Sequence, residues 1–260
     1  MSGPVPLLSY DDPRLVPGRV ALFLDFDGTL AEITERPDAV RVDAETRAML
    51  ARLERATGGA LAIVTGRAIG DIDGFLAPLR LAVAGVHGLE RRTADGARLG
   101  AAIDEAAAAR VRASLEAAAA EMPGTLVEAK PGSLALHYRQ APERAEAAIA
   151  AAHAAVEGLE GVHVLNGKMV VEVKLGSATK ADAVAQFMDE PPFAGRLPVV
   201  CGDDVTDEDA FREAAARGGV TVKIGPGETV AGLRAAGPAE LRRWLVALAD
   251  SFEPEKAETA

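Results

Sequence analysis

Short, almost wholly apolar runs alternate with segments of helical periodicity, and this rhythm constrains the fold more than any other feature of the sequence. Strands that are apolar on both faces lie between two layers of helices, which is the arrangement of a parallel sheet. The first part of the chain therefore predicts an α/β fold. Its expected elements are a strand at 20–25, a helix at 43–56, a strand at 60–64, a helix at 68–76 and a strand at 81–84.

The rhythm changes in the middle of the chain. An alanine-rich stretch with apolar residues at helical spacing predicts a long helix at about 102–122, since alanine is the best helix former. Asn166-Gly167 is typical of a two-residue hairpin turn, so we expect an antiparallel sheet in this block. Its other expected elements are strands at 126–130, 133–139, 162–165 and 168–174 and a helix at 142–156.

After Lys180 the alternation of apolar strands with helical segments resumes, so the middle block is an insertion. With 260 residues and 49% hydrophobic content, the chain can bury one large core or two smaller ones, and the change of rhythm favours two. We expect a first core segment at 1–104, a smaller α/β domain at 105–175 and a second core segment at 176–260. The elements expected in the last segment are a helix at 180–187, a strand at 199–201, a helix at 207–216, a strand at 220–224 and a helix at 238–250.

Charge and composition argue against some classes of partner. The formal net charge is −11, from 39 acids and 28 bases, which disfavours a nucleic-acid partner because phosphate backbones are held by basic surface. Neither a signal peptide nor a membrane-spanning segment is expected, since the apolar runs are short and bounded by charge. The single cysteine, Cys201, cannot form an internal disulfide. We therefore expect a cytoplasmic protein.

Two carboxylates stand one residue apart where the first predicted strand ends, in Asp25-Phe26-Asp27-Gly28-Thr29. Like charges this close repel each other, so the pair favours a cation or a cationic partner. The alternative interpretation is an Asp-Gly turn in which Asp25 caps a helix, because Asp-Gly is a common turn signal. The motif alone leaves both interpretations open.

Three further polar clusters follow apolar strands or open a helix. Thr65-Gly66-Arg67 follows the strand at 60–64, and Lys180 begins a helical stretch. Gly202-Asp203-Asp204 leads into a segment with five acids in the seven residues 203–209. Each has an ordinary interpretation: a strand-to-helix turn, a solvated lysine, and the acidic first turn of a helix. The last does not account for two aspartates placed directly against an apolar strand.

Alternation in the inserted block separates polar faces from apolar ones. Along 133–139 and 168–174 apolar side chains alternate with polar ones, and Glu128 and Lys130 share one face of their strand. Such faces suit either a binding surface or a sheet face in water, and the pattern alone does not decide. The polar residues concerned are Glu128, Lys130, Ser133, His137, Arg139, Lys168, Glu172 and Lys174.

In their order, the four clusters of the core resemble the haloacid dehalogenase superfamily, and the resemblance covers nearly the whole chain. More narrowly, the chain is similar to the trehalose-6-phosphate phosphatase family. Ala181 departs from the pattern, since the family usually has a glycine after the helix-opening lysine; the charge of the lysine is unaffected. The segments that carry the narrower similarity, the last being the most specific, are 24–30, 86–90, 130–133, 137–139, 172–174 and 202–211.

This resemblance implies a Rossmann-like haloacid dehalogenase core, with a parallel sheet and helices on both faces, and an inserted α/β cap with an antiparallel sheet. It implies Mg²⁺-dependent hydrolysis of trehalose 6-phosphate to trehalose and phosphate through an aspartyl phosphate. Trehalose biosynthesis and a functional link to a trehalose-6-phosphate synthase are implied as well. One alternative is a phosphatase of another sugar or glycoside phosphate, such as sucrose phosphate or glucosyl- or mannosyl-glycerate phosphate. Another is a catalytically silent regulatory domain.

The resemblance also implies roles for residues of the core. Asp25 is expected to attack phosphorus as the nucleophile, and Asp27 to act as general acid and then as general base. Thr65 and the Gly66 amide are expected to donate to the phosphoryl oxygens, and Lys180 to offset charge there. The expected metal ligands are Asp25, the backbone carbonyl of Asp27, Asp203 and Asp207, with Asp204 as a further candidate.

Other residues are expected to bind the substrate. Arg67 is either a phosphate-steering residue or a solvated arginine, and the sequence does not distinguish the two. His87, Gly88 and Glu90 are expected near the crevice, in a loop at a strand end. On the cap, polar side chains are expected to hold the sugar hydroxyls. The candidates are Glu128, Lys130, Arg139 and Glu172, followed by Ser133, His137 and Lys168.

Overall fold

The structure divides into two compact units. The first, called the core unit below, comprises Met1–Leu99 and Thr179–Ala260, and the second, the inserted unit, comprises Gly100–Ala178. The chain therefore leaves the core unit once and returns to it. The computed structural model describes residues 5–6, 13–34, 39–100, 105–130, 132–159, 161–167 and 169–253.

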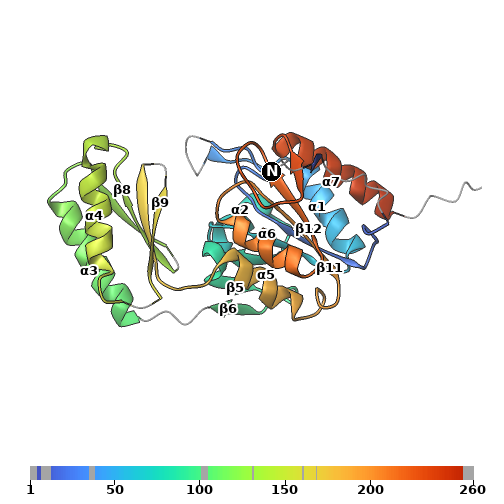
Figure 1. The fold of residues 1–260 in the computed structure, drawn as a ribbon, viewed down its shortest axis with the longest axis horizontal. Coiled ribbons are helices and arrows are strands. Elements are labelled where there is room, and N and C mark those ends of the chain that lie inside the picture. The colour runs from blue at the N-terminus through green and yellow to red at the C-terminus, as the bar shows by residue number, and fades with distance from the viewer. Residues whose placement is uncertain are drawn as a thin grey trace, which may run out of the picture. The chain divides into compact units, whose positions relative to one another are not determined.

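Among the described residues of the core unit, nine strands form one sheet in the order β1-β13-β12-β11-β2-β3-β4-β5-β6 (Figure 1). The pairings from β1 to β4 are parallel, whereas β5 runs antiparallel to β4. The predicted parallel sheet is confirmed, and its antiparallel edge is an addition. The strands are β1 (Val5–Pro6), β2 (Val20–Leu24), β3 (Leu61–Val64), β4 (Ala82–Gly85), β5 (Glu90–Arg92), β6 (Arg98–Gly100), β11 (Leu197–Gly202), β12 (Val220–Ile224) and β13 (Leu233–Ala235).

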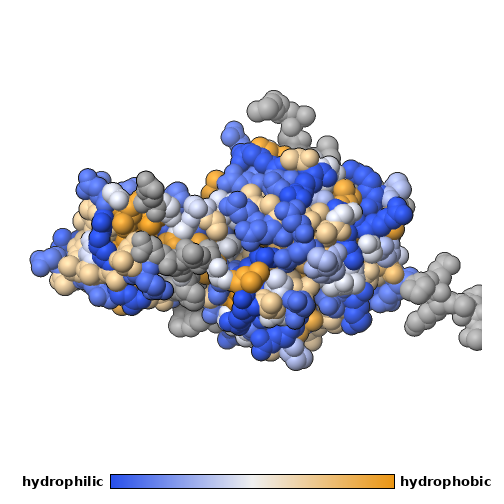
Figure 2. Space-filling model, turned by 90° about the horizontal axis from the view of Figure 1, so that it is seen from below, coloured by the Kyte–Doolittle hydropathy of each residue, from blue (hydrophilic) through white to orange (hydrophobic). Residues whose placement is uncertain are grey.

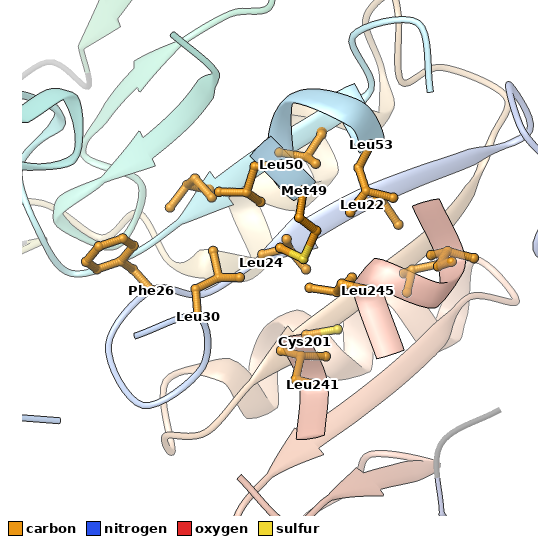
Figure 3. Close-up of a cluster of buried hydrophobic side chains, with 14 of the residues drawn as sticks. Leu22, Leu24, Phe26, Leu30, Met49, Leu50, Leu53, Cys201, Leu241 and Leu245 are labelled. Atoms are coloured by element: carbon orange, nitrogen blue, oxygen red, sulfur yellow. The ribbon is translucent and has the colours of Figure 1, made fainter. Parts of the chain in front are cut away.

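Helices cover both faces of this sheet because its central strands are apolar on both sides. Leu22 and Leu24 of β2 lie in one buried cluster with residues of α1, α2 and α7 (Figure 3). Ala21 and Phe23 point the other way and lie in a second cluster with residues of α5 and α6. The helices are α1 (Ala44–Ala56), α2 (Ile69–Leu76), α5 (Lys180–Met188), α6 (Asp207–Ala216) and α7 (Pro238–Phe252).

Most apolar side chains of the core unit are inside it. Hydrophilic residues cover most of the face of this unit that Figure 2 shows, and the hydrophobic ones there form small separate patches. The exposed large apolar side chains include Ile33, Val205 and Val230, which stand far apart in the sequence. Within the described ranges, no helix has the length and apolar character needed to cross a membrane.

The described part of the inserted unit has four strands that pair antiparallel in the order β7-β8-β10-β9. Two helices, α3 and α4, pack on Leu134, Leu136 and Val171 at one face of this sheet (Figure 1). The predicted antiparallel sheet is confirmed. The elements are α3 (Glu105–Ala120), β7 (Leu126–Lys130), β8 (Ser133–His137), the short helix η3 (Pro142–Arg144), α4 (Ala145–Ala155), β9 (His163–Gly167) and β10 (Val170–Lys174).

The predicted hairpin turn at Asn166-Gly167 is wrong. Strand pairing continues through Gly167, which pairs with Val170, and Met169 between them has a left-handed φ of 64°. The longer pairing places Val164 opposite Val173, and both side chains pack in the hydrophobic cluster beneath the helices. Both residues of the expected turn therefore lie in the strand ladder, where Asn166 pairs with Val171 and Gly167 with Val170.

Candidate active site

The carboxyl ends of neighbouring strands bring the polar clusters of the core unit together. β11, β2 and β3 are adjacent and parallel, so Asp203, Asp25 and Thr65 follow them at one edge of the sheet. The N–H of Asp25 donates to the carbonyl of Cys201 over 2.9 Å, which extends the strand pairing to the site. Lys180 is the first residue of helix α5. The site is therefore assembled from segments far apart in the sequence.

Lys180 bridges two buried carboxylates. Its Nζ donates to Asp25 Oδ1 at 2.8 Å and to Asp207 Oδ1 at 2.7 Å, and all three residues are at most 5% exposed. Burial raises the pKa of Asp25 well above its ordinary value, and the ammonium of Lys180 opposes this shift. Burial also acts to lower the pKa of Lys180, but the charges of Asp25 and Asp207 outweigh it and raise that pKa. The lysine is therefore held charged between two acids.

Three carboxylates in this cluster outnumber the ammonium of Lys180. One carboxylate oxygen from each of Asp25, Asp203 and Asp207 lies within 4.8 Å of the other two. Burial raises the pKa of Asp203 as well, and the hydrogen bond from Thr29 opposes this shift. Hard divalent cations prefer several carboxylate oxygens gathered in this way. The cluster therefore fits a divalent cation, whose charge would offset the excess of acid.

Because this cluster is short of positive charge, Mg²⁺ is expected to stabilise the folded protein against heat. An ion that binds only the folded state adds about 2.7 kcal/mol at 100 times its dissociation constant. Asp203→Asn is expected to raise the Mg²⁺ concentration needed for this gain about tenfold or more. Thermal melts with Mg²⁺ and with a chelator measure the effect.

The matched control for this experiment is Asp209→Asn. Asp209 is an exposed acid of α6 that pairs with Arg212 outside the cluster, so its replacement is expected to leave the Mg²⁺ response unchanged. An equal Mg²⁺ response in Asp203→Asn and in the unsubstituted protein would place the ion elsewhere.

Two glycines allow the carboxylates to approach the backbone. Gly28 has a φ of +78°, and a Cβ there would lie 2.1 Å from Asp203 Oδ2. A Cβ on Gly202 would lie 2.2 Å from Cγ of Asp207. Thr29 Oγ1 donates to Asp203 Oδ1 over 3.1 Å. Close packing therefore requires a glycine at both positions, and at Gly28 the left-handed φ requires it as well.

A turn with strained backbone after β4 holds the loop Thr65-Gly66-Arg67. Val86 and His87 have left-handed φ angles of 47° and 55°, which is unusual for a β-branched residue. Their N–H groups donate to the carbonyls of Arg67 and Thr65 at 3.0 and 2.9 Å. A Cβ on Gly66 would lie 2.7 Å from the His87 ring, so this ring packs directly on the loop. Backbone strain of this kind is concentrated at functional sites.

Gly88 and Glu90 each lie against the start of a helix. A Cβ on Gly88 would lie 2.8 Å from the carbonyl oxygen of Thr179, the N-cap of α5. Glu90 is part of β5 rather than of the expected loop, because its backbone pairs with Gly85 of β4. Its Oε1 accepts a hydrogen bond from the N–H of Ile69 over 2.6 Å, in the first turn of α2. Glu90 therefore bonds the first turn of α2, and Gly88 packs closely against the N-cap of α5.

Arg67 was expected either to steer phosphate or to be exposed to solvent, and the structure excludes the second interpretation. Its Nε donates to Asp27 Oδ2 at 2.6 Å and its Nη2 donates to Asp27 Oδ1 at 2.7 Å. The side chain of Arg67 is 14% exposed and that of Asp27 is 36% exposed. A bidentate, partly buried ion pair therefore joins the second acid of the first motif to the loop after β3.

On the inserted unit, the two carboxylate candidates share a face of the sheet. Glu128 and Glu172 both pair with Ala135, one from each side. Ala135 alternates with residues that pack on the helices, so this face is the one opposite α3 and α4. Nε2 of His137 lies 2.8 Å from Glu128 Oε2. The sheet therefore presents two carboxylates and an imidazole together.

The remaining candidates of the inserted unit occupy different environments. Ser133 is fully buried in β8. Arg139 follows this strand and is exposed. Lys130 ends β7, where its backbone pairs with that of Ser133. Lys168 lies outside the described residues.

One residue at the site escaped sequence reasoning. Lys223 of β12 is 5% exposed, and its Nζ donates to the backbone carbonyl of Asp203. A buried lysine that holds this carbonyl also holds the loop that carries the Asp203 carboxylate. The available signal was a lysine inside the otherwise uncharged predicted strand at 220–224.

Comparison with known proteins identifies relatives of this arrangement. Residues 23–235 match the family described as trehalose-phosphatase. The chain is 39% identical over 238 residues to a protein named trehalose-6-phosphate phosphatase from Escherichia coli (strain K12), covering 92% of this chain and 90% of that protein.

Solved structures share the fold. The C-terminal domain of a trehalose-6-phosphate phosphatase from C. albicans matches with a TM-score of 0.80 and 22% identity, covering 96% of this chain and 99% of that one. A haloacid dehalogenase-like hydrolase from B. subtilis matches with a TM-score of 0.64 and 14% identity, covering 87% and 98%. The predicted haloacid dehalogenase fold is therefore confirmed.

Proposed function

The chain belongs to the trehalose-phosphatase family, and from this premise we propose that it hydrolyses trehalose 6-phosphate to trehalose and inorganic phosphate. The observation that carries the proposal is the buried bridge from Lys180 to Asp25 and Asp207, with Asp203 beside it. Phosphate monoesters hydrolyse very slowly unaided, so a site must neutralise phosphoryl charge and place a nucleophile in line. This cluster has the groups for both tasks.

The reaction proceeds in two halves. Asp25 attacks phosphorus and forms an aspartyl phosphate, which divides one difficult displacement into two easier ones. Asp27 protonates the departing sugar oxygen and then takes a proton from the water that hydrolyses the intermediate. Both carboxylates follow the same buried strand, β2, which supports a shared role for them in the reaction.

Charge at the phosphoryl group is offset from several sides. Lys180 contributes a fixed positive charge beside Asp25, and Thr65 Oγ1 and the Gly66 amide donate hydrogen bonds to phosphoryl oxygens. A bound Mg²⁺ would neutralise charge on the phosphoryl oxygens and favour the ionised form of the nucleophile. The proposed ligands of this ion are Asp25, the backbone carbonyl of Asp27, Asp203 and Asp207, with Asp204 as a further candidate.

Selection of the sugar belongs to the inserted unit in this proposal. Carboxylates accept the protons of neutral hydroxyls in charge-assisted hydrogen bonds, and Glu128 and Glu172 share one sheet face. In the core unit, His87 and Gly88 are proposed substrate contacts beside the loop Thr65-Gly66-Arg67. The further candidates of the inserted unit are Lys130, Ser133, His137, Arg139 and Lys168.

Trehalose 6-phosphate is expected to be hydrolysed with a kcat/KM at least about tenfold above that of other sugar phosphates. The reason is that a site built to accept hydroxyl hydrogen bonds disfavours a ligand that leaves them unmade. Release of inorganic phosphate, measured over a panel with sucrose phosphate and the glycosyl-glycerate phosphates, tests this. A chelator is expected to remove the activity, and added Mg²⁺ to restore it.

Glu172→Gln tests, in the same screen, whether the carboxylate of Glu172 binds the sugar. It is expected to raise KM for trehalose 6-phosphate about tenfold to a hundredfold, since a charge-assisted hydrogen bond is weakened. Hydrolysis of p-nitrophenyl phosphate, which has no sugar hydroxyls, should change little. Preference for another glycoside phosphate would mean that the chain is a phosphatase of that ester. Absence of any hydrolysis would favour a catalytically silent regulatory domain.

We propose a cytoplasmic location and a functional link to a trehalose-6-phosphate synthase. Such an enzyme would supply the substrate, and a phosphatase that removes the phosphate would make the synthesis of trehalose effectively irreversible. The link follows from the proposed reaction rather than from a contact of this chain.

A further inference from the structure

The pair formed by Arg67 and Asp27 joins two motifs 40 residues apart. Because Nε reaches Asp27 Oδ2 at 2.6 Å and Nη2 reaches Oδ1 at 2.7 Å, both carboxylate oxygens accept a charge-assisted hydrogen bond. A fork of this kind fixes the orientation of the carboxylate plane as well as its position.

Aromatic rings hold the guanidinium in place. It lies over the ring of Phe75, 4.9 Å from the centroid, and 5.8 Å from the centroid of Phe26. These rings stack on each other at 5.4 Å, and Phe26 is fully buried. The carbonyl of Arg67 accepts from the N–H of Val86 at 3.0 Å, which anchors the backbone. Both the backbone and the side chain of Arg67 are therefore held by the fold.

A guanidinium that donates to both oxygens matches a carboxylate, which has two equivalent acceptor oxygens, better than a carboxylic acid, in which one oxygen carries the proton. The observed pair therefore suits Asp27 as a carboxylate, the form that takes a proton from water. It does not suit the carboxylic acid that protonates the sugar oxygen. Since the proposed reaction needs both forms in turn, the pair has to open and close within one catalytic cycle.

We propose that Arg67 is a positioning residue that holds Asp27 for hydrolysis of the aspartyl phosphate, an inference that rests on the proposed function. In the first half-reaction the bond from Asp25 to phosphorus forms, the bond from phosphorus to the sugar oxygen breaks, and the proton of Asp27 moves to that oxygen. The pair closes on the new carboxylate. In the second half-reaction water bonds to phosphorus, its proton moves to Asp27, the bond to Asp25 breaks, and the pair opens.

Arg67→Met tests this role, because methionine can still cover Phe75 but has neither the fork nor the charge. In acid-quenched time courses, sugar release is expected to keep a burst of about one equivalent per enzyme. Phosphate release is expected to fall about 100-fold, so that most of the variant carries aspartyl phosphate at steady state. Arg67→Lys keeps the charge but cannot donate to both carboxylate oxygens in the same way, so phosphate release should fall about tenfold and aspartyl phosphate should again accumulate. This variant replaces Arg67→Met in the experiment if the methionine variant does not fold.

Arg91→Met is the matched control. Arg91 is also buried, donates to Glu190 at 2.5 Å and lies 4.8 Å from the ring centroid of Phe187. This control therefore removes a comparable ion pair and ring contact from the same unit. It is expected to lower stability without accumulation of aspartyl phosphate.

A raised KM with unchanged kcat and no accumulated intermediate would show that Arg67 binds the substrate, and would overturn the proposal. Equal slowing of sugar and phosphate release would overturn it too. The unsubstituted protein separates this inference from the proposed function. If it hydrolyses p-nitrophenyl phosphate but not trehalose 6-phosphate, the burst is measured with that ester and only the substrate assignment fails. If it hydrolyses neither, both proposals fall.

Discussion

Asp25→Asn is expected to lower phosphate release by at least about 10⁴-fold while the protein stays folded. An amide is a poor nucleophile toward phosphorus, so the aspartyl phosphate cannot form. The substitution also removes one of the two carboxylates that Lys180 bridges, in a cluster of three acids. In the presence of a chelator we therefore expect the variant to be at least as stable as the unsubstituted protein. Phosphate release and thermal melts on the same preparation measure both effects.

The control for this prediction is Asp71→Asn, which replaces an exposed acid of α2 and should leave activity unchanged. Phosphate release by Asp25→Asn within tenfold of that of the unsubstituted protein would refute the role of Asp25 as nucleophile. A variant that is inactive because it is unfolded would be recognised by the loss of its melting transition.

Lys180→Met is expected to cost about 3–5 kcal/mol in the free energy of unfolding and to abolish activity. The lysine is 3% exposed and serves both Asp25 and Asp207, so its loss leaves two buried carboxylates without their cation. Denaturant titration in the presence of a chelator measures the stability. The chelator is needed because a bound divalent cation would replace part of the missing charge.

A double variant makes this prediction specific to charge. Adding Asp207→Asn to Lys180→Met removes one of the stranded carboxylates, so part of the lost stability is expected to return. Activity should not return, because the positive charge beside the nucleophile is still missing. A loss below about 1 kcal/mol for Lys180→Met would mean that the carboxylates are hydrated or protonated at no cost, and that the lysine is not needed to balance their charge.

The main elements of the core could be predicted because their signals are local. A continuous apolar run such as 20–24 indicates a strand buried on both faces, and its alternate residues do face two different helix layers. The strands that sequence reasoning missed, β1, β5, β6 and β13, have only two or three residues each. Segments this short carry no periodicity, and they become strands only because a neighbouring strand is there to pair with.

The candidate site was predictable in part for the same reason. Acids placed directly after apolar strands indicate the carboxyl edge of a parallel sheet, and Asp25 and Asp203 do meet there. The pairing of Asp27 with Arg67 and the contact of Lys223 with the carbonyl of Asp203 had no such local signal. The predicted hairpin turn was wrong because Asn166 and Gly167 both pair with β10, at Val171 and Val170, and a local turn preference does not show how far a strand pairing extends.

The sequence by itself determined the α/β class, the insertion and the strand ends at which the acids stand, because each depends on residues within one short segment. Only the tertiary structure decided which charges meet. Lys180 reaches an acid 155 residues away, and Arg67 one 40 residues away. The physical reason is that an ion pair depends on the distance between groups in space, and that distance is set by how strands and helices pack.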